Sequence, residues 1–468
     1  MKSHNIHGAW LGPVLLAICC LATSLAAQTR TLRIVTYNIE DDINGATTPL
    51  PGLLAPPGNP SNVQAGGVLE GIGEELVGND PAQPLDILAL EETTSNSGTV
   101  APIAAGLNLF YGVAGMYASS RYQATQFGGS TNNSSGNGPN ALVYNTKTVQ
   151  LLASVPVDPP GGIGNLGPAS GEYREVMRYE FAPAGVAPAA ANEFYIYVSH
   201  YKASTGTANE NYRNGEAKII RNDEADSLPA NARVLYVGDY NVDNSGEPMY
   251  QTMLAATAPN GIPQGQGVDP LNPEDNPNLD WSTSTADTNL LLLLTEETYE
   301  LRYRDDLQVM TTNVYHGTPD GLKYVPGTYH AFGNNGTTIY SGSVNNGANT
   351  ALNNRLVTNA PAFISAAQLY LDLTDASDHL PVVADYTIPL PAPVISGFNV
   401  AGTNLILNVA NCITGGVFTV LMSTNLALPL INWTALATAT ATNSSFTFTA
   451  TNAVNPAAFG QFYLLQER

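Results

Sequence analysis

Residues 234–241 read Val-Leu-Tyr-Val-Gly-Asp-Tyr-Asn, an apolar run followed directly by a polar group. A short apolar run of this kind predicts a buried strand. The stretch Asn209 to Leu228 before it has helical composition and ends at Pro229. Another apolar run, Phe194 to Val198, precedes that helix. The order strand, helix, strand predicts a layered α/β core.

Comparable apolar runs recur along the chain, and most of them lie beside a polar cluster. They are Leu32 to Tyr37, Leu85 to Leu90, Ala141 to Tyr144, Leu307 to Met310 and Leu380 to Ala384. Such runs are typical of strands that are buried on both faces. Long segments rich in Gly, Asn, Pro and Ser lie between them, and we interpret these as surface loops: Asp42 to Gly67, Phe127 to Pro139, Asp243 to Asp280 and Phe332 to Asn353.

The composition changes after the Pro-rich segment 389–393, which we interpret as a linker. Residues 394–468 are rich in Val, Thr, Ala, Asn and Leu in short alternating runs, and their only charges are Glu467 and Arg468. This pattern predicts a small all-β sandwich. Nothing in the segment has a catalytic pattern, so we expect an accessory domain that follows a larger domain of residues 28–388.

The first 27 residues predict a secretory signal peptide. Lys2 is followed by an apolar run from Trp10 to Ala22 and by the small-residue stretch Ser24 to Ala27. The run is short for spanning a bilayer, and it ends in a cleavage-like pattern. A membrane anchor is the alternative. After cleavage only Cys412 would remain, which excludes an intramolecular disulfide. We expect a secreted, periplasmic or cell-surface protein without stable membrane insertion.

The chain is acidic because cations are scarce. It has 17 Lys plus Arg against 39 Asp plus Glu, a formal net charge of -22. A negative surface repels a polyanion at long range, so a nucleic-acid substrate would need metal ions and a few local cations to be held. The charge therefore argues against tight DNA binding, but it leaves DNA hydrolysis open.

Histidines and carboxylates lie at the ends of the apolar runs. His200 follows one run and His379 precedes another, while carboxylates occur at Glu91-Glu92, Asp239 and Asp378. A single such residue is usually structural. If the strands lie in adjacent layers, however, their polar ends meet at one rim, where open α/β sheets bind ligands. Clustered oxygen ligands suit Mg²⁺ or Mn²⁺, which can neutralise charge during phosphate ester hydrolysis.

Six short motifs carry these groups, in the order Tyr37-Asn38-Ile39, Leu90-Glu91-Glu92, Ser199-His200-Tyr201-Lys202, Gly238-Asp239-Tyr240-Asn241, Arg304-Asp305-Asp306-Leu307 and Ser377-Asp378-His379-Leu380-Pro381. Each motif alone is a weak signal. Together, over about residues 31–388, they resemble the endonuclease/exonuclease/phosphatase family, which includes DNase I-like nucleases, inositol-polyphosphate phosphatases and neutral sphingomyelinases. The resemblance implies a four-layer α/β sandwich of two mixed β-sheets with helices outside. It also implies hydrolysis by direct in-line displacement, with no covalent enzyme intermediate.

The resemblance further implies a role for each motif residue. Glu92 would be the principal metal ligand, and Asn38 and Asp378 would complete the metal site directly or through water. Asp239 would orient and deprotonate the attacking water. Asn241 would hold Asp239 or a phosphate oxygen.

The two histidines would act on the phosphate itself. His379 would contact the scissile phosphate and would be oriented by Asp306 as its hydrogen-bond partner. The family usually has an apolar residue where this chain has Asp305, so Asp305 is the alternative partner. His200 would donate to a phosphate oxygen or protonate the leaving group.

Two cations are candidates for binding the substrate phosphate. Lys202 lies two residues after His200 in the same motif, and Arg174 begins a strand much as a phosphate-contacting arginine does in DNase I-like members. The alternative for Arg174 is an ion pair with Glu172 or Glu175. The family often has Gln where this chain has Glu91, which adds negative charge beside the metal and could favour a second cation or tighten the first.

These observations predict a secreted, divalent-metal-dependent phosphoesterase, in the first place a nuclease that cuts phosphodiester bonds. The alternatives are a phosphomonoesterase or sphingomyelinase-like phospholipase, and a surface binding protein that has lost catalysis. Mg²⁺ or Mn²⁺ is the expected cofactor. Ca²⁺ is a further candidate, because the carboxylates of the segment Asp269 to Asp280 could bind it, although the alternative is a solvated acidic loop. Nucleic acid is the expected partner, and no protein partner is evident.

Overall fold

The computed structural model describes residues 28–40, 52–54, 67–77, 82–120, 138–157, 174–281, 294–295, 303–318, 320–334, 336, 343–353, 355–356, 364–390, 392–412, 416–458 and 460–467. The predicted signal peptide lies outside these residues. The described chain divides into two units. Thr29–Ala184 with Pro188–Pro389 form the larger unit, and the strands that follow Leu390 belong to the other.

Two large mixed sheets form the framework of the larger unit. The first has the order β11-β13-β1-β2-β4-β3, and β12 also pairs with β13. Its strands are β1 (Gln28–Asn38), β2 (Ile87–Glu91), β3 (Tyr117–Ser119), β4 (Ala141–Asn145), β11 (Lys323–Tyr324), β12 (His330–Ala331) and β13 (Val382–Leu390). β1 and β2 are parallel, whereas β2 and β4 are antiparallel.

The second sheet has the order β5-β6-β7-β8-β10-β9. Its strands are β5 (Val149–Val157), β6 (Val176–Pro183), β7 (Phe194–His200), β8 (Val234–Asp239), β9 (Gly267–Val268) and β10 (Asp306–Thr311). β7 and β8 are parallel, and β10 runs antiparallel to β8. The predicted apolar runs therefore form the central strands of both sheets.

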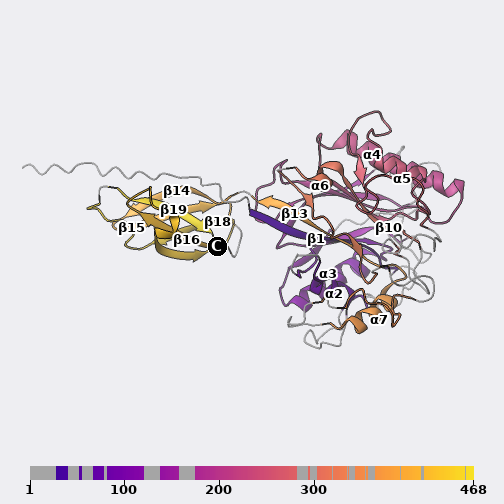
Figure 1. Ribbon diagram of the computed structural model, residues 1–468, viewed down its shortest axis with the longest axis horizontal. Coiled ribbons are helices and arrows are strands. Elements are labelled where there is room, and N and C mark those ends of the chain that lie inside the picture. The colour runs from indigo at the N-terminus through magenta and orange to yellow at the C-terminus, as the bar shows by residue number, and fades with distance from the viewer. Residues whose placement is uncertain are drawn as a thin grey trace, which may run out of the picture. The chain divides into compact units, whose positions relative to one another are not determined.

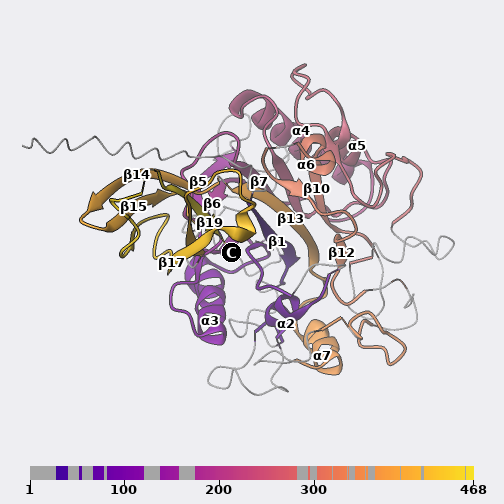
Figure 2. The ribbon, with the colours of Figure 1, turned by 60° about the vertical axis from the view of Figure 1, so that its left-hand side comes forward.

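Helices cover the outer faces of the two sheets (Figure 1). On one side lie α2 (Val68–Glu74), α3 (Ala101–Tyr111), which follows the π-helical turn Asn96–Val100, and α7 (Ala366–Ala376). On the other side lie α4 (Thr207–Ser227), α5 (Pro248–Leu254) and α6 (Thr312–His316), an arrangement that Figure 2 shows from a second direction. The four-layer α/β arrangement expected from the sequence is confirmed.

The side chains of each central strand alternate between the two faces of its sheet, and both faces are buried. In β1, Leu32 and Ile34 join the apolar cluster between the sheets, and Val35 and Tyr37 join the cluster beneath the helices. Successive residues of a strand point to opposite faces, so a strand covered on both sides is mostly apolar, and buried polar residues such as Arg33 need hydrogen-bond partners. Truncating a core side chain such as Ile196, which is fully buried, would cost about 2–5 kcal/mol.

One predicted surface loop is wrong in part. The segment Asp243 to Asp280 contains α5 and β9, and it ends beside Trp281 in the apolar cluster of the second sheet. Met249 and Met253 lie on one face of α5 and are fully buried there. The Gly, Asn and Pro content of the segment concealed this short helix, which packing stabilises more than propensity does. The loop segments Asp42 to Gly67 and Phe127 to Pro139 lie mostly outside the described residues.

The strands after Leu390 form two three-stranded antiparallel sheets. β14 (Val394–Ala401), β15 (Asn404–Ala410) and β18 (Ser445–Ala450) form one sheet. β16 (Val417–Ser423), β17 (Thr434–Thr440) and β19 (Phe462–Glu467) form the other, and a short 3-10 turn covers Leu430–Asn432. One apolar cluster that includes Leu407, Phe418 and Phe448 belongs to both sheets. This is the small all-β sandwich that the sequence predicts.

Candidate active site

The ends of five central strands meet at one rim between the two large sheets. The register places Asn38 opposite Glu91 across the parallel β1 and β2. It places Asp239 opposite His200 across β7 and β8, and opposite Asp306 across β8 and β10. Parallel neighbours end on the same side, and the antiparallel β10 begins where β8 ends, so their terminal polar side chains gather there.

Gly238 allows β7 and β8 to approach closely at this rim. It has a φ of 139°, and a Cβ atom at this position would lie 1.8 Å from the carbonyl oxygen of Ser199. Any larger residue would push the two strands apart. The glycine of the Gly-Asp-Tyr-Asn motif therefore sets the distance between His200 and Asp239.

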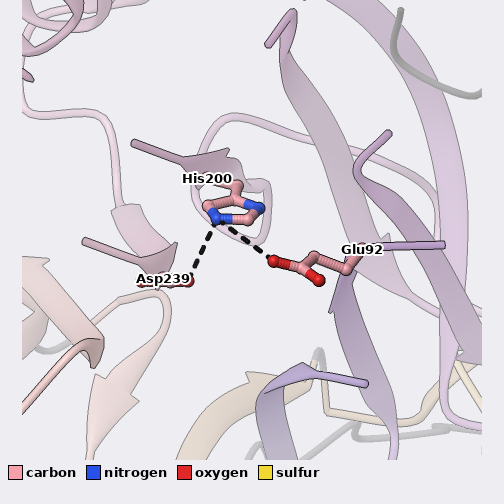
Figure 3. A group of neighbouring side chains, drawn as sticks. All are labelled: Glu92, His200 and Asp239. Atoms are coloured by element: carbon pink, nitrogen blue, oxygen red, sulfur yellow. Dashed lines mark ion pairs between the residues drawn. The ribbon is translucent and has the colours of Figure 1, made fainter. Parts of the chain in front are cut away.

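Glu92, His200 and Asp239 form a compact group of side chains (Figure 3). Their ligand atoms lie within 4.8 Å of one another. His200 Nε2 lies 3.1 Å from Asp239 Oδ2 and 3.7 Å from Glu92 Oε1. The three residues are only 8%, 1% and 2% exposed, in that order, so the group is sheltered from solvent. Two carboxylates and an imidazole this close together could hold a divalent cation.

Glu92 lies one residue beyond the end of β2 and has a φ of 55°. A non-glycine residue in this left-handed region is disfavoured, and such residues persist where the surrounding structure enforces them. The turn takes the chain out of the strand, and the Glu92 carboxylate points toward His200 (Figure 3). The main-chain bend therefore contributes to the position of this side chain.

Three donors hold the carboxylate of Asp239. Asn38 Nδ2 donates to Oδ2 over 3.1 Å, and the main-chain N–H of Asn241 donates to Oδ1 over 2.9 Å. His200 Nε2 is the third partner. Burial alone would raise the pKa of Asp239, but His200, His379 and the bond from Asn38 outweigh it and lower the pKa. Asp239 is therefore a fixed anion that accepts hydrogen bonds.

His200 is held as a neutral ring. Burial, followed by repulsion from Arg174, lowers the pKa of His200 to about 4, although Asp239 opposes this shift. Arg174 is buried, and its Nη1 donates to the main-chain carbonyls of His200 and Tyr201 over 3.2 and 3.1 Å. The arginine thus fixes the main chain at the end of β7. Its predicted contact with the substrate phosphate stays a prediction.

His379 and Asp306 form a second pair at the same rim. His379 Nδ1 lies 2.7 Å from Asp306 Oδ2, and both residues are buried. Burial would lower the pKa of His379, but the adjacent Asp306 carboxylate raises it well above its usual value. The structure thus brings Asp306 to the histidine, and not Asp305. Thr295 Oγ1 accepts the main-chain N–H groups of both aspartates, each over 3.1 Å.

Two predicted metal ligands lie outside the group of three. Asn38 contacts Asp239 through its amide, and its Oδ1 accepts the N–H of Glu40. Asp378 is partly exposed and lies beside His379, with 3.7 Å between Asp378 Oδ1 and His379 Nε2. The candidate metal group therefore contains Glu92 as predicted, together with His200 and Asp239, for which the sequence indicated other roles.

Arg213 of α4 holds the loop that carries Lys202. Its Nη1 donates to the carbonyls of Lys202 and Ser204, and its other nitrogens bind both oxygens of Glu247 over 3.0 and 2.9 Å. Lys202 itself is half-buried and donates to Ala203 O over 2.8 Å. Sequence reasoning missed Arg213, because no local pattern shows that a helix residue will reach a loop eleven positions earlier in the chain.

Other residues near the motifs have structural roles. Asn241 Nδ2 donates to Tyr201 O over 3.2 Å, which ties the ends of β7 and β8 together. Asp269 is fully buried and pairs with Arg304, which also lies 4.7 Å from the centre of the Trp281 ring. Because it is paired with Arg304, the Asp269 carboxylate is not available to a Ca²⁺ ion. The Ca²⁺ site predicted for the segment Asp269 to Asp280 therefore lacks one of its expected carboxylate ligands.

Glu91 points into the protein and is fully buried. Its Oε1 accepts a bond from Thr36 Oγ1 over 3.1 Å. Burial, followed by repulsion from Asp306 and Asp239, raises the pKa of Glu91 well above its usual value. Glu91 therefore favours its neutral form, and its buried side chain does not extend the exposed charge of the site.

No family model matches the sequence, and no curated protein matches it. The chain is similar to the catalytic domain of human Nocturnin with a bound sulfate anion, at 15% identity, covering 77% of this chain and 97% of that one, with a TM-score of 0.39. It is similar to an endonuclease/exonuclease/phosphatase family protein from Bacteroides thetaiotaomicron, at 11% identity, covering 78% and 98%, with a TM-score of 0.36.

An endonuclease/exonuclease/phosphatase from Beutenbergia cavernae DSM 12333 is also similar, at 15% identity, covering 94% of this chain and 95% of that one, with a TM-score of 0.35. Two of these three structures carry the name of the family that the six sequence motifs resemble. The likenesses are distant, so the function proposed below rests on the residues of the site.

Proposed function

We propose that this protein is a divalent-metal-dependent phosphoesterase, and that its first substrate class is the phosphodiester bond of nucleic acid. The observation that carries the proposal is the buried group of Glu92, His200 and Asp239, set beside the His379–Asp306 pair. The carboxylates that could bind a cation and the histidine that could bind a phosphate therefore lie at the same rim. A bound cation and a charged histidine can each stabilise the negative charge of a phosphate ester.

The residues present fit a hard divalent cation. Glu92 and Asp239 supply carboxylate oxygens, and the neighbouring Asn38 supplies an amide. Carboxylate and amide oxygens favour Mg²⁺ or Mn²⁺, and an imidazole in the same group is also compatible with transition metals. A bound cation would neutralise charge on the phosphate and lower the pKa of a bound water.

The side chains of the chain itself would position the reactants. Asp239, held by three donors, would accept a hydrogen bond from the attacking water and so orient it. His379, whose charged form Asp306 favours, would donate to a phosphate oxygen. His200 Nε2 faces both carboxylates, from where it can donate to Asp239 or to a phosphate oxygen.

We also propose that the protein acts outside the cytoplasm. This proposal rests on the composition of residues 1–27, which predicts a signal peptide. Among the described residues, no helix combines the length and the apolar character that crossing a bilayer requires. Fractionation of the native host and N-terminal sequencing of the mature protein would test it. An intact N-terminus on a cytoplasmic protein would contradict it.

The activity is tested on four substrates: double-stranded DNA, RNA, sphingomyelin and a simple phosphomonoester, each with Mg²⁺ and with EDTA. We expect EDTA-sensitive cleavage of nucleic acid by the wild type and its loss in Glu92→Gln. Cleavage of only the lipid or the monoester would leave a metal-dependent phosphoesterase but overturn the nucleic-acid substrate. Inactivity on all four would contradict the proposal.

Metal binding has a readout that does not depend on activity. A ligand that binds the folded state alone raises the melting temperature. We expect Mg²⁺ or Mn²⁺ to raise the melting temperature of the wild type and to have a smaller effect on Glu92→Gln. Asp223→Asn is the matched control, because Asp223 pairs with Arg178 and Tyr197 and has no contact with the metal group. An equal shift in all three proteins would exclude this metal site.

A further inference from the structure

Thr295 adjoins the His379–Asp306 pair, although none of the six sequence motifs contains it. It lies outside the strands of both large sheets and is only 1% exposed. Its hydroxyl oxygen and its main-chain carbonyl accept hydrogen bonds from two different segments of the rim. One segment carries Asp306, and the other carries His379.

The Thr295 side chain holds the start of β10. Its Oγ1 accepts the main-chain N–H groups of Asp305 and Asp306, each over 3.1 Å. A hydroxyl oxygen has two lone pairs, so these two bonds use its full capacity as an acceptor. The same segment is also bound to the end of β8, because the carbonyl of Asp305 accepts the N–H of Tyr240 over 2.6 Å. The main chain that carries Asp306 is therefore fixed by bonds to Thr295 and to the end of β8.

The Thr295 main chain holds the segment that carries His379. Its carbonyl accepts the N–H of Leu380 over 2.7 Å. Leu380 directly follows His379 and is fully buried in the same apolar cluster as Tyr37 of β1. The N–H of His379 itself donates to Ser377 Oγ over 3.1 Å. The main chain at His379 and at the next residue is therefore held by directed bonds.

Thr295 thus connects the two segments whose side chains form the pair. Asp306 begins β10 of the second sheet, whereas His379 precedes β13 of the first sheet. The contact of 2.7 Å between His379 Nδ1 and Asp306 Oδ2 therefore crosses from one sheet to the other. Apolar contacts between packed sheets are non-directional, whereas a hydrogen bond depends on both distance and angle. Thr295 supplies directed bonds to both sides of this contact.

We propose that Thr295 is a positioning residue, which sets the geometry of the His379–Asp306 pair and thereby directs His379 toward the phosphate. The inference rests on the proposed function, because His379 has a phosphate to contact only in that case. A displacement of about 1 Å in an active site can lower a rate about a hundredfold. Thr295→Val keeps the shape of the side chain, but it removes the oxygen that accepts the two N–H groups.

The first measurement is kcat and KM on a p-nitrophenyl diester with saturating Mg²⁺ or Mn²⁺. We expect Thr295→Val to lower kcat about tenfold and to change KM less than about twofold, because the weakened contact is made mainly in the transition state. Thr295→Ser retains the oxygen, so its kcat should be close to that of the wild type. The same loss of kcat in Thr295→Ser would show that the oxygen is not the cause, and it would overturn the proposal.

Thr311→Val is the matched control. Thr311 is 3% exposed, and its Oγ1 accepts the main-chain N–H of Val234 over 3.1 Å at the other end of β10. The five residues from Asp306 to Thr311 span about 17 Å of strand. We expect this variant to melt at a lower temperature, because a buried N–H loses its acceptor, and to keep the wild-type kcat. Equal losses of kcat in Thr295→Val and Thr311→Val would point to a general loosening of β10 and would overturn the proposal.

A double variant tests whether Thr295 acts through His379. We expect Thr295→Val combined with His379→Ala to have the same kcat as His379→Ala alone, because the imidazole that Thr295 positions is then absent. A further tenfold loss in the double variant would show that Thr295 affects the reaction by another route. That result would also overturn the proposal.

A spectroscopic readout without substrate separates this inference from the proposed function. The proton between His379 Nδ1 and Asp306 Oδ2 should give a downfield proton resonance that is absent from His379→Ala. We expect Thr295→Val to shift or broaden this resonance and Thr311→Val to leave it unchanged. If Thr295→Val does not fold, Thr295→Cys takes its place, because sulfur is a weaker acceptor.

The outcomes of the two kinds of measurement are distinct. An unchanged resonance and an unchanged kcat in Thr295→Val would overturn the positioning role and leave the phosphoesterase standing. A wild type that hydrolyses no diester would contradict the proposed function, and the resonance would still decide whether Thr295 fixes the pair.

Discussion

Replacing Asp239 by Asn is the most informative single perturbation of the site. The side chain keeps its shape, but one carboxylate oxygen becomes an NH₂ donor. Asp239 Oδ2 faces Asn38 Nδ2 and His200 Nε2, each 3.1 Å away, and Oδ1 faces the N–H of Asn241 at 2.9 Å. In either orientation of the amide, at least one buried donor therefore meets another donor.

The structure allows the cost of this change to be worked out. Each buried donor without an acceptor costs about 1–3 kcal/mol, so the folded state should lose roughly that amount. The loss of the anion that would orient water should lower kcat by about a thousandfold, which corresponds to about 4 kcal/mol of transition-state stabilisation. We expect a protein that is folded, slightly less stable and almost inactive.

The assay is kcat/KM on a p-nitrophenyl diester with saturating Mg²⁺ or Mn²⁺, together with a thermal melt with and without the metal. Asp223→Asn is the control, because it removes a carboxylate that binds Arg178 and Tyr197 outside the site. It should lose stability and retain activity. If Asp239→Asn kept kcat/KM within about tenfold of the wild type, the assignment of Asp239 would be refuted.

Three further predictions concern other titratable groups. Asp306→Asn and His379→Ala should each lower kcat about a hundredfold. The double variant should have no lower kcat than His379→Ala, because the two side chains act as one unit. Additive losses of kcat in the double variant would contradict this. Glu91→Gln should leave the melting temperature and the activity close to those of the wild type. The buried Glu91 favours its neutral form, and the amide oxygen of Gln can still accept the hydrogen bond from Thr36. A large loss of stability or activity would show that the anion is needed. Burial raises the pKa of Glu74 to about 7, so its protonated form favours folding, a contribution that is complete below about pH 4.5 and is lost as the pH rises through 7. Glu74→Gln should therefore raise the melting temperature by about 2 °C at pH 8 and leave it unchanged at pH 4, and an equal effect at both pH values would exclude this cause.

The central strands could be predicted from sequence because their signal is local. The run Val234 to Val237 lies within β8, and Asn209 to Leu228 nearly coincides with α4. Strands covered on both faces are apolar at most positions, so burial by the covering helices is visible in the sequence of each strand. The helix α5 was missed for the opposite reason. It spans seven residues and is stabilised mainly by its packing against the second sheet.

The sequence by itself determined which residues occur at strand ends, and the motif order was enough to indicate a phosphoesterase. It did not determine which of them touch. Only the tertiary structure brought Asp239 into contact with His200 and Asn38, placed Asp306 rather than Asp305 at His379, and buried Arg174 against the main chain of β7. The physical reason is that hydrogen bonds depend on distances of about 3 Å, and these are set by strand register and the approach of two sheets. Asn38 and Asp239 are 201 positions apart in the chain, and they carry no local sign of that contact.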